Sequence, residues 1–91
     1  MNHFYRDVPG LGNVAFSRHA QERLTDEGVS EETVRRILYN AAQKDISDSQ
    51  GVVHREGYGI RLVILLNPTP DRGAKLVKTA YRIQANHRVR Y

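Results

Sequence analysis

The chain has no cysteine and no tryptophan, and its longest purely apolar run is the short stretch from Leu62 to Leu66. The lack of cysteine excludes disulfide frameworks and thiolate metal sites. An apolar run this short cannot cross a bilayer, which takes about 20 residues. The first residues also lack the basic and then apolar pattern of a secretory signal peptide. We therefore expect a soluble chain, with no membrane contact, held together by a hydrophobic core.

The length of the chain, 91 residues, predicts a single domain. Size scaling indicates that about 64% of the surface of the unfolded chain can be buried on folding, which is enough for one modest core. The composition, 40% apolar and 26% charged, is typical of globular proteins. We predict one domain over residues 1–91, with its core over about 14–84 and a basic tail over 85–91.

Charge is distributed unevenly along the chain, although the net charge is only +4. Residues 1–53 hold 6 basic and 8 acidic side chains, whereas residues 54–91 hold 8 basic and 2 acidic ones. After Asp71 no acidic residue follows, and Tyr81 and Tyr91 lie among the basic side chains. Cations beside aromatic rings suit phosphate neutralisation and base stacking, so the pattern predicts nucleic-acid binding. A solvated basic strand is the alternative that charge alone leaves open.

Two helices are predicted in the first half of the chain. Ser17 is a suitable N-cap for a helix over 18–26, and Gly28 is a suitable stop. Ser30 is a second N-cap, followed by acidic residues that the helix dipole favours in a first turn. The apolar spacing of the second helix predicts one buried stripe, formed by Val34, Ile37, Leu38 and Ala41.

After Ala42 the pattern becomes extended, and four strands are predicted, over 44–48, 52–56, 59–66 and 74–83. Residues 57–59 suit a tight hairpin, and the strand over 59–66 is apolar enough to be central. Residues 1–16 are interpreted as a turn-rich opening. The predicted fold class is α+β, with two N-terminal helices packed on a four-stranded antiparallel sheet. Strict alternation along the last strand places Val77, Thr79, Tyr81 and Ile83 on one face and Lys78, Ala80 and Arg82 on the other.

His19 and Arg23 form the most suggestive polar pair, because i, i+4 spacing places both side chains on one helical face. At the rim of the core an imidazole can act as a general base and an arginine can hold a phosphate. The alternative is a packing histidine with Arg23 bridging to Glu22 or Glu27. The four histidines form no metal-binding spacing, so neither a metal ion nor a cofactor is expected.

No motif for a protein nucleophile is present. RNA cleavage needs none, because the 2′-hydroxyl of the substrate attacks its own phosphate once a base removes its proton and cations stabilise the added charge. His, Arg, Lys and Tyr side chains suffice for this chemistry.

The run Phe16-Ser17-Arg18-His19-Ala20-Gln21-Glu22-Arg23-Leu24, followed by Gly28-Val29-Ser30 and Val34, resembles the S-x-H-A-x-x-R opening of a small bacterial and phage domain family. That family is placed near the BrnT and RelE toxins, within the grouping of barnase-like, EndoU-like, colicin-like and RelE-like (BECR) nucleases. The resemblance spans residues 16 to about 83. It implies a RelE- or barnase-like fold and metal-independent RNA cleavage. It also implies action in the bacterial cytoplasm, as a toxin–antitoxin partner or as the effector tip of a contact-dependent inhibition toxin.

The sequence thus predicts a toxin-type, metal-independent endoribonuclease, with tRNA among the candidate substrates and an acidic antitoxin or immunity protein as its partner. The predicted catalytic residues are His19 as acid/base, Arg23 and Lys78 as transition-state stabilisers, and Thr79 or Tyr81 as the orienting group. The residues predicted to hold the RNA backbone are Lys75, Arg82, Arg88 and Arg90. Two alternatives stay open, namely a non-catalytic module that binds nucleic acid or protein, and a subunit that dimerises through a sheet edge.

Overall fold

The computed structural model describes residues 3–40, 44–47, 51–67 and 74–83. None of the helices in this part of the chain is long and apolar enough to span a membrane. The elements in chain order are β1 (Phe4–Val8), β2 (Gly12–Phe16), α1 (Arg18–Asp26), α2 (Glu31–Tyr39), β3 (Lys44–Ser47), β4 (Val52–Gly57), β5 (Ile60–Leu65) and β6 (Lys75–Arg82).

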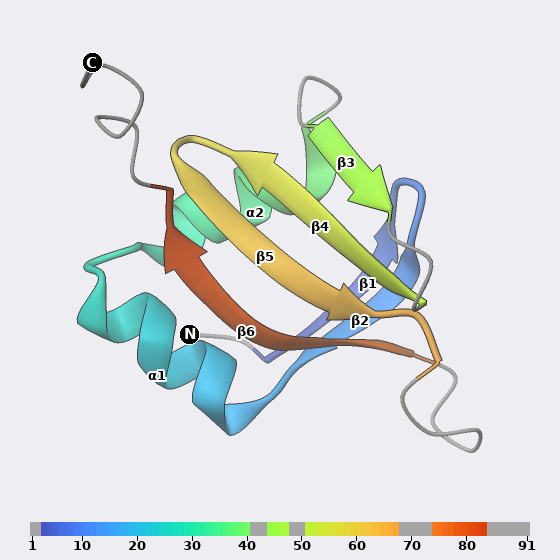
Figure 1. The fold of residues 1–91 in the computed structure, drawn as a ribbon, viewed down its shortest axis with the longest axis horizontal. Coiled ribbons are helices and arrows are strands. Elements are labelled where there is room, and N and C mark those ends of the chain that lie inside the picture. Colours follow the sequence, from blue (N-terminus) through green and yellow to red (C-terminus); the bar gives the residue numbers. More distant parts are fainter. Residues whose placement is uncertain (1–2, 41–43, 48–50, 68–73, 84–91) are drawn as a thin grey trace, which may run out of the picture.

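All six strands form one sheet in the order β1-β2-β6-β5-β4-β3, which Figure 1 shows from its open face. Four of the pairings are antiparallel, and β2 with β6 is parallel. The predicted fold class is therefore wrong in three respects: the sheet has six strands, it is mixed, and the helices follow β1 and β2. The four strands predicted after residue 42 are confirmed within a few residues, and β5 is internal as expected.

The interpretation of residues 1–16 as a turn-rich opening is wrong, because they contain β1 and β2. Their turn residues form the bend of a hairpin, in which the Leu11 N–H donates to the Val8 carbonyl at 2.9 Å. Each strand of this hairpin has only 5 residues, and the pairing is irregular between Tyr5 and Val8. Because the strands are short and interrupted, they lack the sustained period-2 alternation by which a strand is recognised.

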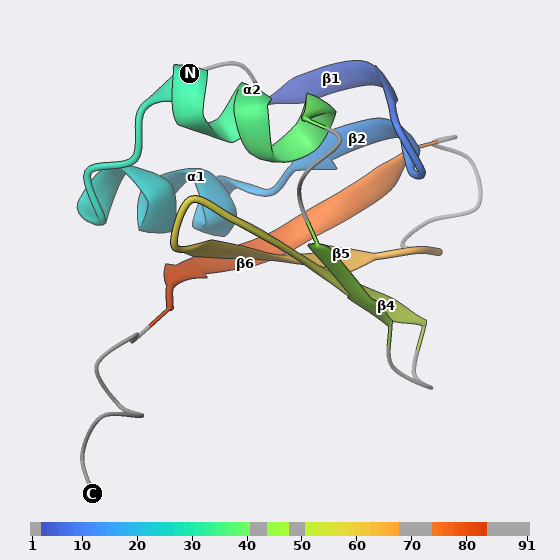
Figure 2. The ribbon, with the colours of Figure 1, turned by 90° about the horizontal axis from the view of Figure 1, so that it is seen from above.

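Both helices lie on one face of the sheet, as Figure 2 shows from above. The core between the two layers is apolar and continuous from β1 to β5. Tyr5 lies within it, with its ring edge-on to Phe16 at 5.5 Å between centroids. Burial raises the pKa of Tyr5 to about 12, and the nearby Glu31 carboxylate adds to the effect while Arg35 opposes it.

The predicted N-caps of both helices are confirmed. Ser17 Oγ accepts a hydrogen bond from the Ala20 N–H at 3.0 Å, and Ser30 Oγ accepts one from the Thr33 N–H at 3.2 Å. The stop after α1 is confirmed too, since Gly28 has a positive φ of 71°, the conformation that glycine adopts at the end of a helix.

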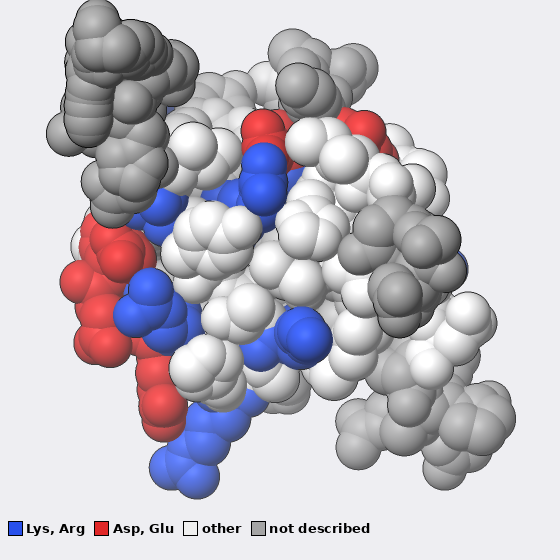
Figure 3. Space-filling view, in the orientation of Figure 1, with Lys and Arg blue, Asp and Glu red and all other residues white. Residues whose placement is uncertain are grey.

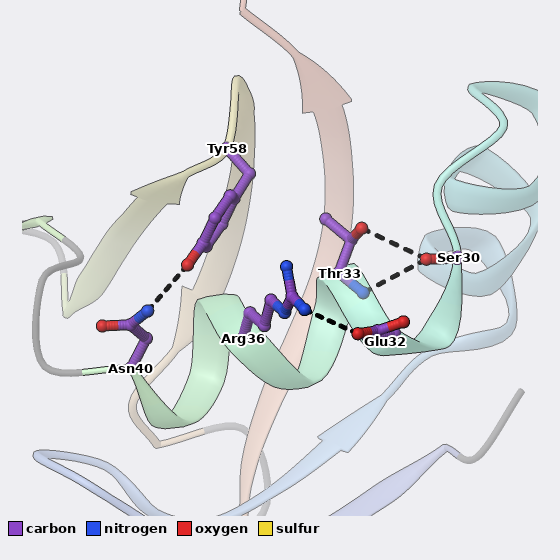
Figure 4. Close-up of polar contacts among 6 residues, drawn as sticks. All are labelled: Ser30, Glu32, Thr33, Arg36, Asn40 and Tyr58. Carbon is purple, nitrogen blue, oxygen red and sulfur yellow. Dashed lines mark hydrogen bonds and ion pairs between the residues drawn. The ribbon is translucent and has the colours of Figure 1, made fainter.

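Side-chain contacts also fix the far end of α2, as Figure 4 shows. Asn40, the C-cap, donates from Nδ2 to the Tyr58 hydroxyl at 2.7 Å, which ties α2 to the turn between β4 and β5. On the outer surface of α2, Arg36 and Glu32 form an exposed ion pair at 2.7 Å. The helix is thus joined to the sheet at its end as well as through its buried stripe.

Arg55 on β4 is the one charged side chain that is buried within the described residues, at 3% exposure. Its guanidinium donates twice to the Asp45 carboxylate of β3, at 2.7 and 2.8 Å. It also donates to the Leu38 carbonyl at 2.8 Å and to the Pro9 carbonyl at 2.7 Å. One side chain therefore joins β3, β4, the end of α2 and the β1–β2 turn.

A bulge in β6 overturns the predicted division of its faces. Val63 pairs with Thr79 and Ile64 pairs with Val77, so Lys78 has no partner on β5. Val77 and Ala80 consequently both lie in the core, at 0% and 1% exposure. Strict alternation would have put them on opposite faces, and the extra residue of the bulge resets the period.

Candidate functional site

The second half of β6 lies beside α1. The parallel partner β2 pairs only with Lys75, Leu76 and Val77 of β6. Beyond that point the chain of β2 turns into α1, and Ser17 donates from N to the Val77 carbonyl and from Oγ to the Lys78 carbonyl, both at 3.0 Å. At the other end of α1, Arg82 donates to the Glu27 carbonyl at 2.6 Å.

These contacts set α1 level with β6. Ser17, at the start of α1, contacts the bulge of β6, and Glu27, at its end, contacts Arg82, so the two elements run in the same direction. Their lengths also match, since a helix rises about 15 Å from residue 17 to 27 and a strand rises about 13 Å from residue 78 to 82. His19, in the first turn, is therefore level with the bulge that carries Lys78. The side chains of His19 and Lys78 are both exposed. Within the described residues no hydrogen bond or ion pair engages His19. The structure thus brings these two predicted residues to neighbouring elements at the same height.

Arg23 lies one turn after His19 and is already engaged. Its guanidinium contacts the Glu27 carboxylate at 3.6 Å, and Arg82 contacts the same carboxylate at 3.4 Å. Glu27 thus bridges two of the predicted cations at the far end of α1. This arrangement matches the structural alternative for Arg23, and a phosphate would have to compete with Glu27 for either guanidinium.

Thr79 and Tyr81 lie on the open face of the sheet and are half-buried. The Tyr81 hydroxyl accepts a hydrogen bond from Arg61 at 3.3 Å, and the guanidinium lies 6.0 Å from the centroid of the tyrosine ring. Arg61 in turn forms an ion pair with Glu56. Glu56, Arg61 and Tyr81 are register partners across β4, β5 and β6, so they form one row across the sheet.

Glu56 and Arg61 were not predicted from the sequence, although a signal for their pairing was present. A two-residue turn at Tyr58 and Gly59 pairs the positions before and after it, and the next pair outward is then Glu56 with Arg61. Opposite charges directly across two strands stabilise a sheet, so this pair was predictable from the turn.

The open face is only sparsely charged. Figure 3 shows separate Lys and Arg side chains among uncharged ones, with the acidic side chains gathered at the margins. Lys75 is half-buried at the start of β6, whereas Arg88 and Arg90, and the basic tail as a whole, lie outside the described residues. A cavity of about 320 Å³ on the outward side of α1 is lined by Arg18, Gln21, Glu22, Thr25 and Asp26, none of which was predicted to act.

Comparison with known proteins found no match to any protein-family model, curated protein or solved structure. Among the described residues no group of three or more metal-ligating side chains comes together. The function must therefore be argued from the surface around β6 itself.

Proposed function

We propose that this chain is a metal-independent endoribonuclease of the toxin type, which binds RNA along β6 and α1. The observation that supports the proposal best is the placement of His19 and Lys78. Both side chains are exposed, and the hydrogen bonds from Ser17 to β6 hold their elements together. An imidazole and an ammonium group level with each other are a titratable group and a cation of the kind that RNA cleavage requires.

In the proposed reaction the 2′-hydroxyl of a ribose attacks the adjacent phosphorus, and the bond from phosphorus to the 5′-oxygen breaks. His19 serves as the acid/base residue, and Lys78 stabilises the charge that develops on the phosphate. Tyr81 or Thr79 orients the ribose from the open face. Arg23 adds to charge stabilisation only when it exchanges Glu27 for phosphate, so its contribution is smaller than that of a free guanidinium.

RNA binding in this proposal uses Lys75 and Arg82 on β6, together with the basic residues that follow it in the sequence. Such a toxin needs an inhibitor, and a basic surface is best covered by an acidic protein. We therefore include an acidic antitoxin or immunity protein as the partner in the proposal.

The test is cleavage of total RNA, tRNA and a labelled oligoribonucleotide by the purified chain in excess EDTA. The proposal expects cutting that survives chelation, produces 2′,3′-cyclic phosphate ends and fails on the 2′-deoxy oligonucleotide. His19→Ala and Lys78→Ala should slow the reaction. The matched control is Arg18→Ala, since Arg18 lies on the same helix with its side chain 92% exposed. Intact RNA, or cutting that chelation abolishes, would refute the proposal.

A non-catalytic binding module is the second candidate, and one observation favours it. The described residues provide no hydrogen-bond partner that would hold His19 in one tautomer, whereas catalytic histidines are usually oriented by a third group. This candidate expects binding to RNA that weakens steeply with salt, no cleavage, and no effect of His19→Ala.

A further inference from the structure

One arginine on the outer surface of α2 differs from the arginines around it. The other arginines of the two helices and of β4, β5 and β6 each contact a carboxylate, and they are Arg18, Arg23, Arg36, Arg55, Arg61 and Arg82. Within the described ranges, 3–40, 44–47, 51–67 and 74–83, Arg35 forms neither an ion pair nor a hydrogen bond. Glu31 lies four residues earlier, at the spacing of an ion pair, and still does not contact it.

Two tyrosine rings hold Arg35 instead. The central carbon of its guanidinium lies 5.8 Å from the centroid of the Tyr5 ring and 5.7 Å from that of the Tyr39 ring. Tyr39 is itself fixed, because its hydroxyl donates to the Arg6 carbonyl of β1 at 2.7 Å. A contact with an aromatic ring engages the charge of a guanidinium and leaves its N–H groups to other partners. The protein therefore positions Arg35 without using its hydrogen-bond donors.

This guanidinium borders a cavity. The cavity has a volume of about 410 Å³ and is lined by Glu32, Arg35, Arg36, Tyr39 and Asn40. Figure 4 shows part of its lining, with Arg36 paired to Glu32 and Asn40 held by the Tyr58 hydroxyl. Sites for small molecules have volumes of about 300–1,000 Å³. The cavity therefore has room for a small molecule beside a guanidinium that is already in place.

A second unsatisfied polar group lies next to Arg35. The Tyr5 hydroxyl is buried and has no hydrogen-bond partner in the described part of the chain. Besides burial, the charges of Glu31 and Arg35 and the Tyr39 hydroxyl influence the pKa of Tyr5, so these polar groups lie close together. Buried polar groups in proteins nearly always have a partner. Unused donors on Arg35 and Tyr5 thus occur at one place, where α2 meets β1.

The charges around the cavity favour one kind of ligand. Glu31 and Glu32 balance Arg35 and Arg36, so this surface has no excess charge that would attract a polyanion from a distance. A ligand must instead be held by direct hydrogen bonds. A guanidinium can donate two parallel bonds to a carboxylate, which brings only one negative charge near the two glutamates. A phosphate monoester carries about 1.5–2 negative charges and is repelled more strongly.

We propose that the α2 cavity binds a small organic acid, whose single carboxylate accepts two hydrogen bonds from Arg35. The apolar part of the acid lies against the Tyr39 ring. The site is independent of the proposed ribonuclease function, because α2 covers the face of the sheet opposite to the one that carries Tyr81, as Figure 2 shows for the helices.

The experiment titrates the full chain with sodium benzoate and follows the side-chain N–H signals of its arginines by NMR. We expect saturable shifts centred on Arg35, with a Kd in the millimolar range, which is typical of a ligand of about nine non-hydrogen atoms. Arg35→Gln should weaken binding by about 10-fold or more, because it removes hydrogen bonds to a charged group. Arg35→Lys keeps the charge without the two-pronged geometry and should bind with intermediate affinity. Arg18→Gln is the matched control, since Arg18 is also an exposed helical arginine but lies on α1.

Two further ligands test the chemistry of the site. Benzyl alcohol has the ring but no carboxylate and should not bind, and inorganic phosphate should bind more weakly than benzoate. Equal shifts at Arg18 and Arg35, or shifts that Arg35→Gln leaves unchanged, would mean that benzoate only screens surface charge, and the inference would be wrong. Tighter binding of phosphate than of benzoate would overturn the assignment of a carboxylate. Since no RNA is present, a negative result leaves the ribonuclease proposal standing.

Discussion

The buried guanidinium of Arg55 provides the sharpest test of the energetics of this fold. Two ion pairs in the structure have the same closest distance, 2.7 Å, namely Arg55 with Asp45 and Arg36 with Glu32. The side chain of Arg55 is 3% exposed, whereas that of Arg36 is 57% exposed. If burial decides how much an ion pair contributes to stability, the same substitution at the two positions must change the free energy of unfolding by very different amounts.

Arg55→Met removes the donors of four hydrogen bonds and leaves the Leu38 and Pro9 carbonyls without that partner. Breaking a buried pair costs about 3–5 kcal/mol, and the lower end applies here because Asp45 is 39% exposed and can be rehydrated. A loss of about 3 kcal/mol lowers the Tm of a domain this small by about 12–24 °C. Arg36→Met should cost only about 0.3–0.5 kcal/mol, since exposed i, i+4 pairs contribute little.

The assay is thermal and urea unfolding of both variants, followed by circular dichroism. Similar Tm values for Arg55→Met and Arg36→Met would refute the argument, because the two pairs match in closest distance and in charge but differ in burial and in the number of hydrogen bonds that the guanidinium donates. Arg55→Lys separates charge from geometry. A lysine keeps the positive charge but cannot form the two-pronged bond to Asp45, so its stability should lie between those of the native chain and Arg55→Met.

Three further predictions concern single side chains. Ser17→Ala should lower the free energy of unfolding by about 1–2 kcal/mol in urea titrations, because it removes the α1 cap and the bond to the Lys78 carbonyl. Tyr5→Phe should be nearly neutral at pH 7, because the buried hydroxyl has no hydrogen-bond partner among the described residues, but it should remove a loss of stability that begins near pH 10 and continues through about pH 12. The native chain loses stability over this range because its folded state holds the Tyr5 proton more tightly than its unfolded state does. The measurement is the difference in Tm between the native chain and Tyr5→Phe from pH 9 to pH 12. Gly59→Ala should cost about 1 kcal/mol from backbone strain alone, since φ is +77° and, apart from the adjacent residues, none of the described residues lies within 4 Å of an added Cβ; urea unfolding would show this loss.

The parts of the fold that could be predicted from sequence are those determined by neighbours in the chain. Ser17 and Ser30 cap the helices because their side chains reach N–H groups three residues ahead. The turn at Tyr58 and Gly59 sets the register of β4 and β5 in the same local way. In each case the physical cause lies within a few residues.

The parts that could not be predicted depend on distant pairings. Val14 pairs with Lys75 in the parallel ladder, 61 positions away, and nothing near either residue indicates it. The environment of Arg23 depends on Glu27 and also on Arg82, which belongs to β6. The exposure of His19 and Lys78 was compatible with the predicted site, but the bulge that exposes Lys78 has no signature in the residues around it.

The bulge connects core packing to the proposed site. β2 ends at Phe16 because Ser17 begins the helix, so β6 loses its second neighbour at Val77. At that point the strand contains one extra residue, which lets both Val77 and Ala80 pack in the core while Lys78 is pushed outward. Core packing thus determines where the Lys78 side chain lies, but it does not require a charged residue at this position.

Lys78→Ala therefore changes the charge at the surface without disturbing the bulge, so a loss of RNA cleavage or binding in that variant reports on the cation. Deleting residue 78 instead leaves Val77 and Ala80 two positions apart, so strict alternation then keeps both on the core face, and the variant should stay folded while it loses both the bulge and the cation.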